Sequence, residues 1–533
     1  MACLAVLSLA ACAIGPNYKK PPVDTPDRFR GAPPVEEPAE APAPAEPEEA
    51  TGREGEEEEA STQVPLEVAK SMADLPWWEV FEDPVLQELL TTSLEQNYDL
   101  KIAVARTMQA QQQVTATRSA FFPQVGYSGS GRRSKYPIDL LGNSQQKFTA
   151  FLGVLSAAWE IDVWGRIRRA NQSAKAQLLA SEENQRAVLV SLVSEVASLY
   201  LQLVELDAEL AIAEEAVRAF QGTLDLFTRK YEGGVASKLQ VTRAAAAKAQ
   251  ADAWIPPIKI AREAVENRLS VLLGRPPGPI PRGKPLIEQT LPDIPPGLPS
   301  ELLERRADVL AAEQEVVATN AEVGVAMGNF LPRIGLTAVW GGSSDKLADL
   351  ANGSASVWSV AAEFSGPLFR AGMLYAEYKA AVARWEEAKA RYELTALRSF
   401  AEVSDALVAR DLLREQRVAR AVESQQLQES VNLSLIRYKQ GMASYFEVLQ
   451  AQQDLFPALF QLAQTRLDEL RTVIRLYKVL GGGWKLGTQW LPEPPESEGG
   501  EESDAEGGEE NDAEGGEEET GEGAAPASEA SAS

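Results

Sequence analysis

The chain contains 533 residues, no histidine and only two cysteines, Cys3 and Cys12. These counts exclude disulfides beyond Cys12, Ser-His and Cys-His nucleophile pairs, histidine proton relays and most zinc sites, so an enzyme would need a carboxylate-based mechanism. The formal charge of −27 lies almost entirely in two segments: residues 32–62 carry −10 and residues 493–533 carry −16, which leaves −1 for the remainder. A nearly neutral body without a basic patch predicts no nucleic-acid partner.

The first residues predict the compartment. Leu4–Ala10 form a short apolar run, and Leu9-Ala10-Ala11-Cys12 is typical of a lipoprotein signal that is cleaved before the cysteine. The run is too short to span a bilayer. We therefore expect residues 1–11 to be removed, lipid to be attached to Cys12, and residues 12–31 to follow as a lipid-anchored segment. A plain signal peptide or an ordinary cysteine is the alternative.

Two acidic segments flank the body of the chain. Residues 32–75 and 487–533 are rich in Glu, Pro, Ala or Gly and contain few large apolar side chains. Such segments cannot bury enough surface to offset their conformational entropy, so we expect a disordered linker and a disordered tail.

The sequence between these segments repeats itself. Phe121–Gly126 returns as Phe330–Gly335, an offset of 209 residues (330 − 121). Around two glycines the offset is 207 (441 − 234), where Lys230-Tyr231 and Ser237 return as Arg437-Tyr438 and Ser444. The repetition predicts one fold built from two halves, residues 76–298 and 299–486, rather than two separate domains.

Each half is expected to contain the same series of helices. A helix over 85–120, or over 300–330, leads to the Phe-Pro element, and a very long helix follows the strands. In the first half this helix runs from Arg166 to Tyr231, which corresponds to about 100 Å at ~1.5 Å per residue. Its apolar residues alternate steps of three and four, the pattern of a heptad seam. They are Leu189, Leu192, Val196, Leu199, Leu203, Leu206, Leu210, Ala213, Val217, Phe220, Leu224, Phe227 and Tyr231. The second long helix spans roughly 372–437, and Pro256-Pro257 divide the return helix of the first half in two.

Alternating apolar and polar residues predict strands over 124–132, 333–342 and 357–364. One face suits lipid and the other suits water, and the polar segments 133–147 and 342–356 join the strands into hairpins. The edge of a soluble β-sandwich would show the same alternation. Four strands cannot close a barrel and open edges are not tolerated in lipid, so several chains would have to share one barrel.

Six motifs follow one another along the chain: Cys12–Pro21, Pro76-Trp77-Trp78, Asp83-Pro84, Asn97–Leu100, Trp159–Arg166 and Leu303–Asp308. In these motifs the chain resembles the TolC-like outer membrane factor family of efflux lipoproteins. The resemblance covers nearly everything except the two acidic segments. The resemblance implies an α+β membrane protein: a homotrimer with a 12-stranded transmembrane β-barrel in the outer membrane and an α-helical tunnel beneath it. It also implies a passive exit duct without cofactor or bound metal, which works with a periplasmic adaptor and an inner-membrane pump, usually of the resistance-nodulation-division (RND) type.

The two glycine turns are expected to form the periplasmic tip, where the adaptor binds. Glycine permits the positive φ of a tight reversal, and Ser237 and Ser444 are placed to cap the outgoing helices. The expected adaptor contacts are Gly234, Ala236, Ser237, Gly441, Ala443 and Ser444.

The same tips would carry a periplasmic gate. In relatives, acidic residues ring the entrance at the positions of Gln240 and Gln450, which are neutral here. Glu447 lies on the helix face of Gln450 and would supply the acidic ring instead. Tyr231 and Tyr438, each three residues before a tip glycine, are expected to donate hydrogen bonds across helices and brace the closed state.

Two other kinds of protein fit parts of the pattern. A coiled-coil tether without a pore would explain the heptad seam and the lipid anchor, but not the amphipathic strands. A carboxylate-based hydrolase would need Glu160 and Asp162 to pair on one face of a strand, although their place at a strand-to-helix junction is typical of helix capping.

Overall fold

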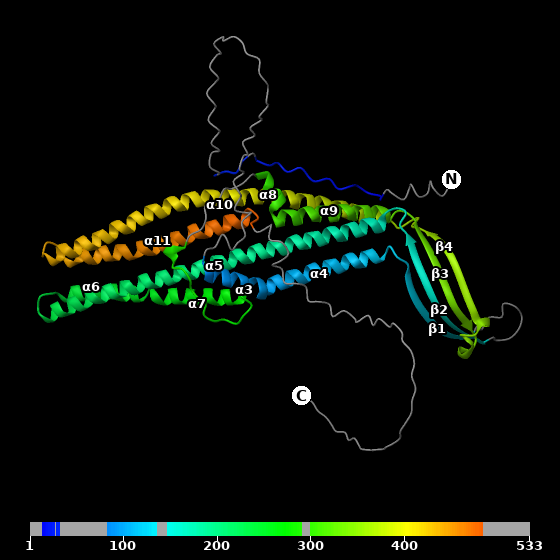
Figure 1. Ribbon diagram of the computed structural model, residues 1–533, viewed down its shortest axis with the longest axis horizontal. Coiled ribbons are helices and arrows are strands. Elements are labelled where there is room, and N and C mark those ends of the chain that lie inside the picture. Colours follow the sequence, from blue (N-terminus) through cyan, green and yellow to red (C-terminus); the bar gives the residue numbers. More distant parts are fainter. Residues whose placement is uncertain (1–12, 27, 32–82, 136–146, 290–298, 483–533) are drawn as a thin grey trace, which may run out of the picture. The chain divides into compact units, whose positions relative to one another are not determined.

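The computed structural model describes residues 13–26, 28–31, 83–135, 147–289 and 299–482 (Figure 1). Cys12, the Pro76-Trp77-Trp78 motif and both acidic segments lie outside these ranges. The first half contains α3 (Pro84–Gln96), α4 (Tyr98–Ser119), β1 (Gln124–Lys135), β2 (Lys147–Ile161), α5 (Arg166–Glu232), α6 (Lys238–Asp252) and α7 (Ile255–Leu272). The second half contains α8 (Pro299–Arg305), α9 (Ala307–Gly328), β3 (Arg333–Ser344), β4 (Ser356–Ser365), α10 (Met373–Lys439) and α11 (Tyr445–Val479). Short 3-10 turns η2 (Leu286–Glu288), η3 (Leu347–Asp349) and η4 (Gly353–Ala355) complete the described elements.

The predicted helices over 85–120 and 300–330 are each broken once, which corrects the expectation of single helices. Asn97 interrupts the first with an extended ψ of 132°. Its Oδ1 caps α4 by accepting from the Leu100 N–H at 3.0 Å, and its Nδ2 donates to the Leu272 carbonyl at 3.0 Å. Arg306 interrupts the second with a ψ of 121°, and its guanidinium pairs with Asp308 and Glu402. Neither break contains proline or glycine at its centre, so the pattern alone did not reveal it.

The two long helices α5 and α10 each contain 67 residues. As predicted, α5 begins at Arg166, and its heptad seam is buried from Leu189 to Leu206 against helices of both halves. Among the described helices, α5 alone is long and apolar enough to cross a membrane, but most of its apolar window is covered by other helices. Its hydrophobicity therefore reflects packing along the seam, not contact with lipid.

The return of the first half is divided as predicted. α6 ends at Asp252 and α7 begins at Ile255, with Pro256 in its first turn, where a missing N–H costs no helical hydrogen bond. In the second half, α11 runs without a break for 35 residues although it contains Pro457. At the far end from the tips, the long helices lead into the sheet (Figure 1).

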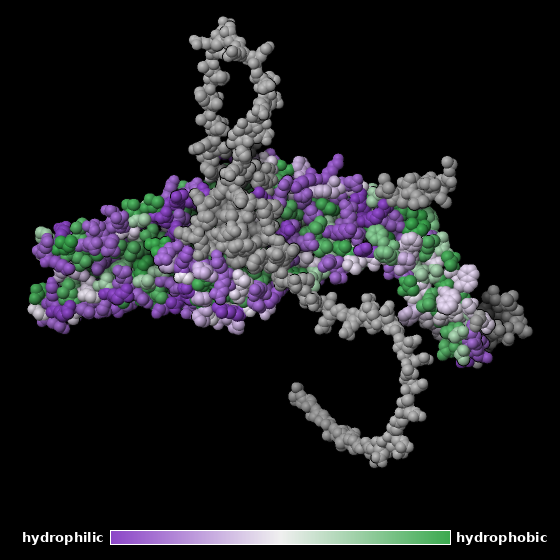
Figure 2. Space-filling model, in the orientation of Figure 1, coloured by the Kyte–Doolittle hydropathy of each residue, from purple (hydrophilic) through white to green (hydrophobic). Residues whose placement is uncertain are grey.

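The four strands form one antiparallel sheet in the order β1-β2-β3-β4, so β1 and β4 are its edges. The predicted strands lie within the observed ones, which extend one to three residues further at several ends. Tyr127, Leu155, Trp340 and Trp358 are consecutive cross-strand partners and form one apolar row across the sheet. The surface of the sheet that is visible in Figure 2 is largely hydrophobic or neutral. The opposite face carries Gln124, Glu160, Arg333, Thr337 and Glu363, which confirms the predicted alternation of an apolar and a polar face.

The segment that follows Cys12 is bound along the helices. Ile14 donates its N–H to the Trp164 carbonyl at 3.0 Å, and Arg169 donates to the carbonyls of Ile14 and Gly15. Further along, Glu313 on α9 accepts from Tyr18 and pairs with Lys20, both at 2.9 Å. This segment therefore starts at the junction of the sheet with α5 and continues onto α9.

Candidate channel gate

Two glycine turns reverse the chain at the tips of the long helices. Gly234 and Gly441 have φ values of 74° and 75°, which explains the glycine at each position. In both turns the residue after the glycine donates back to the helix: Val235 to the Lys230 carbonyl at 2.8 Å, and Met442 to the Arg437 carbonyl at 2.9 Å. This is the Schellman arrangement that closes a helix C-terminus. The two tips are thus built alike.

The serines cap the outgoing helices, but the two caps differ. Ser237 and Gln240 form a capping box, in which Gln240 Oε1 accepts the Ser237 N–H at 2.9 Å. Ser444 has the extended backbone of an N-cap, yet no side-chain hydrogen bond completes it. Gln240 therefore stabilises the start of its own helix, because its carboxamide oxygen is already hydrogen-bonded to the Ser237 N–H.

An aromatic cluster connects the two hairpins just behind the tips. Lys230 of α5 donates a hydrogen bond to the Tyr438 hydroxyl, and its ammonium lies 4.8 Å from the Tyr438 ring centroid. Tyr445 packs edge-on against both Tyr438 and Phe227, at 4.9 Å in each case. Its hydroxyl also bonds Thr223 of α5. The cluster joins α5 to the start of α11 and the end of α10.

The predicted roles of the two tyrosines are therefore corrected. Tyr438 makes the cross-helix hydrogen bond, but it accepts from Lys230 instead of donating. Tyr231 lies under Lys238 of its own hairpin, at 5.4 Å, and is 44% exposed. The two positions are equivalent in the repeat but not in the structure, because Tyr445 stands beside Tyr438 where the first tip has Lys238.

The acidic candidate lies on an exposed face of α11. Glu447 Oε2 is 3.6 Å from Arg437 Nη1, and both side chains are about half exposed, so the pair contributes little to stability. Gln450 is exposed on the same helix and donates to Asp454 at 3.0 Å.

The carboxylates of the hydrolase hypothesis do not form a site. Glu160 is engaged by Arg166 at 2.8 Å. Asp162 lies beyond the end of β2 and accepts the N–H groups of Ile167 and Arg168, at 3.0 and 2.9 Å. Each carboxylate has its own structural partner, and Asp162 caps α5, so the paired arrangement that hydrolysis would need is absent from this junction.

Comparison with known proteins decides the family. The model of the family described as outer membrane efflux protein matches residues 89–275 and 298–482. This chain belongs to that family. The solvent efflux pump outer membrane protein SrpC of Pseudomonas putida is 33% identical over 486 residues, which cover 90% of this chain and 97% of the relative. Outer membrane protein OprJ of Pseudomonas aeruginosa is 30% identical over 490 residues, with coverage of 91% and 96%. The open state of the Neisseria gonorrhoeae MtrE outer membrane channel has a TM-score of 0.76 at 27% identity and covers 90% of this chain and 100% of its own.

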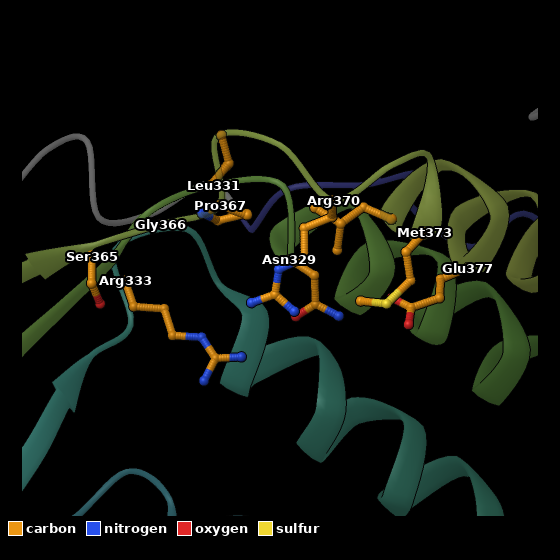
Figure 3. A pocket seen from close by; sticks show the side chains of 10 residues that line it. Asn329, Leu331, Arg333, Ser365, Gly366, Pro367, Arg370, Met373 and Glu377 are labelled. Carbon is orange, nitrogen blue, oxygen red and sulfur yellow. The ribbon is translucent and has the colours of Figure 1, made fainter.

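The protein is therefore an outer-membrane efflux channel with a periplasmic extension, and the tether hypothesis is set aside. A pocket of about 490 Å³ opens at the base of its sheet, between β3, β4 and the start of α10 (Figure 3). Arg333 and Asn329 point into the same space. Arg333 and Arg370 form no ion pair within the described part of the chain. This open, polar lining suits a path for solutes more than a closed binding site.

The sequence analysis missed two residues of the aromatic cluster. Lys230 was noted only as part of the repeat, and Tyr445 was not singled out. A signal for Tyr445 existed: it begins the helix that packs on Phe220 and Phe227, two aromatic seam residues near the tip. An aromatic residue there would be expected to continue the seam.

Proposed function

We propose that three copies of this efflux channel assemble around one axis, each contributing four strands to a 12-stranded transmembrane β-barrel and its long hairpins to an α-helical tunnel. The observation that carries the proposal is an open four-stranded sheet with one apolar face and two edges that no other described residue pairs with. Lipid offers no hydrogen-bond partner to an edge, and each unsatisfied group there costs several kcal/mol. The smallest transmembrane barrels have eight strands, so one chain cannot close alone.

The proposed partners follow from the relatives. SrpC is named as the outer membrane protein of a solvent efflux pump, and OprJ is named as an outer membrane protein. By analogy, this channel would receive its substrate from a periplasmic adaptor and an inner-membrane pump of the RND type. The channel takes no cofactor and no metal; the pump supplies the energy. Lipid on Cys12 would add a second attachment to the outer membrane.

The two glycine turns would be the surface that meets the adaptor. Gly234, Ala236 and Ser237 of one tip, and Gly441, Ala443 and Ser444 of the other, form matching reversals at the same end of the long helices. Both turns are closed by backbone hydrogen bonds and expose an apolar side chain, Val235 in one and Met442 in the other, so they offer an apolar surface to a helical hairpin.

Photo-crosslinkers placed at Ala236 and at Ala443 should therefore capture the adaptor in intact cells. The matched controls are crosslinkers at Thr337 of β3 and at Leu347 of the β3–β4 connection, which lie in the sheet half of the molecule. Adaptor captured from the control positions and not from the tips would refute the assignment of the tips.

The aromatic cluster would hold the gate closed, and the Glu447 side chains would line its opening. The Lys230–Tyr438 hydrogen bond ties the two hairpins of one copy together, and breaking it would let them separate. Three copies of Glu447 would meet near the axis, one turn nearer the tip than Gln450. Three carboxylates at close range attract a cation, so we expect cations to block this channel although Gln240 and Gln450 replace the acidic residues that relatives carry.

Single-channel conductance of purified protein in planar bilayers tests the gate. We expect Glu447→Ala to change conductance and cation block most, whereas Gln450→Ala should change them little because Gln450 is neutral.

The same measurement tests the hydrogen bond between Lys230 and Tyr438. Lys230→Met and Tyr438→Phe should each raise the resting conductance, and the double variant should resemble either single variant because both substitutions remove the same bond. Independent, additive effects of Lys230→Met and Tyr438→Phe would show that their hydrogen bond does not hold the gate closed. If Glu447→Ala changed neither conductance nor cation block, the gate would have to close by apolar packing alone.

A further inference from the structure

The pocket at the base of the sheet is lined by two arginines from different elements. Arg333 begins β3, and Arg370 lies in the connection between β4 and α10. Both are exposed, and neither forms an ion pair within the described part of the chain. The Asn329 carboxamide points into the same space and has no hydrogen-bond partner among the described residues (Figure 3). The polar groups of this pocket are therefore open to a ligand from outside the chain.

The first half of the chain contains an equivalent junction between sheet and helix, and its charges are paired. Arg166 of α5 pairs with Glu160 at 2.8 Å, and Arg168 pairs with Asp162 at 3.2 Å. Each of these two arginines thus has a carboxylate of the same junction beside it. Their positive charges are neutralised within the chain.

The internal repeat relates the two junctions residue by residue. α5 and α10 both begin one residue after a glycine of positive φ, and these glycines give an offset of 207 (372 − 165). With this offset, Glu160 corresponds to Pro367 and Asp162 corresponds to Phe369. The second junction therefore lacks both carboxylates that neutralise the first.

The two arginines of the pocket stand where the first half has neutral residues. Arg370 corresponds to Val163 with the same offset of 207 (370 − 163). Arg333 corresponds to Gln124 with the offset of 209 that relates the two Phe-Pro elements (333 − 124). The paired arginines of the first junction are in turn replaced by uncharged residues. The second junction has thus exchanged two paired arginines for two unpaired ones.

The acids near the pocket do not neutralise its arginines. Glu377 of α10 lines the pocket, so the arginines outnumber it two to one. Glu363 lies on the polar face of β4, diagonal to Arg333, and neither acid forms an ion pair within the described part of the chain. β1, β2 and α4 beyond its first turn contain one acid, Glu160, which Arg166 holds. A further copy of the chain therefore has no free carboxylate to bring to the pocket from these elements.

We propose that Arg333 and Arg370 make this pocket a selectivity site for anionic solutes, which carry a carboxylate or phosphate group through the channel. A guanidinium presents a planar set of N–H donors that matches both groups, and a cleft lined by one sign of charge raises the local concentration of the opposite ion. The Asn329 carboxamide adds a donor beside them. Because Arg333 lies on the polar face of the sheet, the ligand reaches the pocket from water and not from lipid. This inference rests on the proposed function and adds the substrate class.

The ion selectivity of the purified full-length channel in planar bilayers tests the site. The reversal potential in a potassium chloride gradient gives the permeability of the anion relative to the cation. We expect Arg333→Gln and Arg370→Gln each to lower this ratio about two- to fivefold, the effect of removing one charge close to a water-filled path. Arg333→Lys/Arg370→Lys keeps both charges and should retain the selectivity of the parent protein. Arg414→Gln removes an exposed arginine from the middle of α10 and is the matched control, which should leave the ratio unchanged.

Inorganic phosphate is the second probe of the pocket. Added to the chloride solution, it should lower the conductance of the parent channel by occupying the site. The double variant Arg333→Gln/Arg370→Gln should need at least about tenfold more phosphate for the same block, because it loses both charged donors. Ser365→Asp should act in the same direction as Arg333→Gln. Residue 365 lies directly opposite Arg333 in the β3–β4 pair, so an aspartate there would supply the missing carboxylate.

The possible failures are distinguishable. A parent protein that forms no channel would refute the proposed function. A conducting parent protein whose selectivity and phosphate block are unchanged in Arg333→Gln/Arg370→Gln would overturn the selectivity site alone. Each measurement is repeated in bilayers with and without phosphatidylglycerol, and we expect the same result in both. An effect of the two arginines that requires phosphatidylglycerol would assign the pocket to a lipid phosphate and overturn its assignment to solutes.

Discussion

Glu205 is a buried acid in the middle of α5, and only 4% of it is exposed. Burial and the charge of Glu209, one turn away, raise the pKa of Glu205 to about 8, while Arg471 of α11 opposes the rise and Asp468 adds to it. In the unfolded chain a glutamate releases its proton near 4.5. The folded protein thus holds a proton between pH 4.5 and about 8 that the unfolded chain has lost, and its stability falls as the pH rises through this window.

Glu205→Gln should remove this dependence. We expect the variant to unfold at the same temperature as the parent protein at pH 4.5 and at a higher temperature at pH 8, with a gain of up to about 4 kcal/mol there. Thermal unfolding of detergent-solubilised protein at both pH values measures it. Glu214→Gln, an exposed position on the same helix, is the matched control. Parallel pH profiles for Glu205→Gln and the parent protein would contradict the prediction.

At the scale of elements, the long helix α5 could be predicted from the sequence because its apolar seam repeats every three or four residues. The split of the α6–α7 return was also predictable, since Pro256-Pro257 act locally. The breaks at Asn97 and Arg306 were not, because each depends in addition on a partner that is distant in the sequence. Asn97 is held by the Leu272 carbonyl, and Arg306 by Glu402.

The same contrast applies to the gate. Glycine and serine at the tips are local signals, and both were predicted. The Lys230–Tyr438 bond joins residues 208 positions apart, so only the packing of α5 against the second hairpin brings them together.

Substitutions at Asn97 separate its two roles. Asn97→Ala loses both the cap of α4 and the bond to the Leu272 carbonyl, and we expect a loss of about 1–3 kcal/mol in unfolding free energy. Asn97→Asp keeps the cap acceptor and loses the donor, so it should be destabilised less than Asn97→Ala. Hydrogen exchange of the amides in α4 reports the cap directly: exchange should accelerate near Leu100 in Asn97→Ala only. Equal exchange in the two variants would mean that the break at Asn97 is maintained by packing alone.

For the whole molecule, the fold class followed from combining features that are weak one by one. The strands alone fit a soluble sandwich equally well. Their apolar face, their unpaired edges and helices of 67 residues together fit a channel that crosses both a membrane and the space beneath it. The number of copies could not be predicted from the strands and helices alone, because a single chain carries only one side of each contact between copies.

The two proposed attachments to the membrane differ in strength. Two or three acyl chains on Cys12 would anchor the chain to one leaflet, whereas a closed barrel would span both leaflets. The bound segment from Ile14 to Lys20 would fix a lipid on Cys12 near the base of the sheet, so both proposed attachments would act at the same membrane. Cys12→Ser should therefore lack the acyl mass of the parent protein yet stay in the membrane pellet after a high-pH wash, and keep its conductance in planar bilayers. Intact mass spectrometry and fractionation measure the two effects separately. Release of Cys12→Ser by the wash would show that the lipid, and not the sheet, holds this protein in the membrane, and the barrel would fail with it.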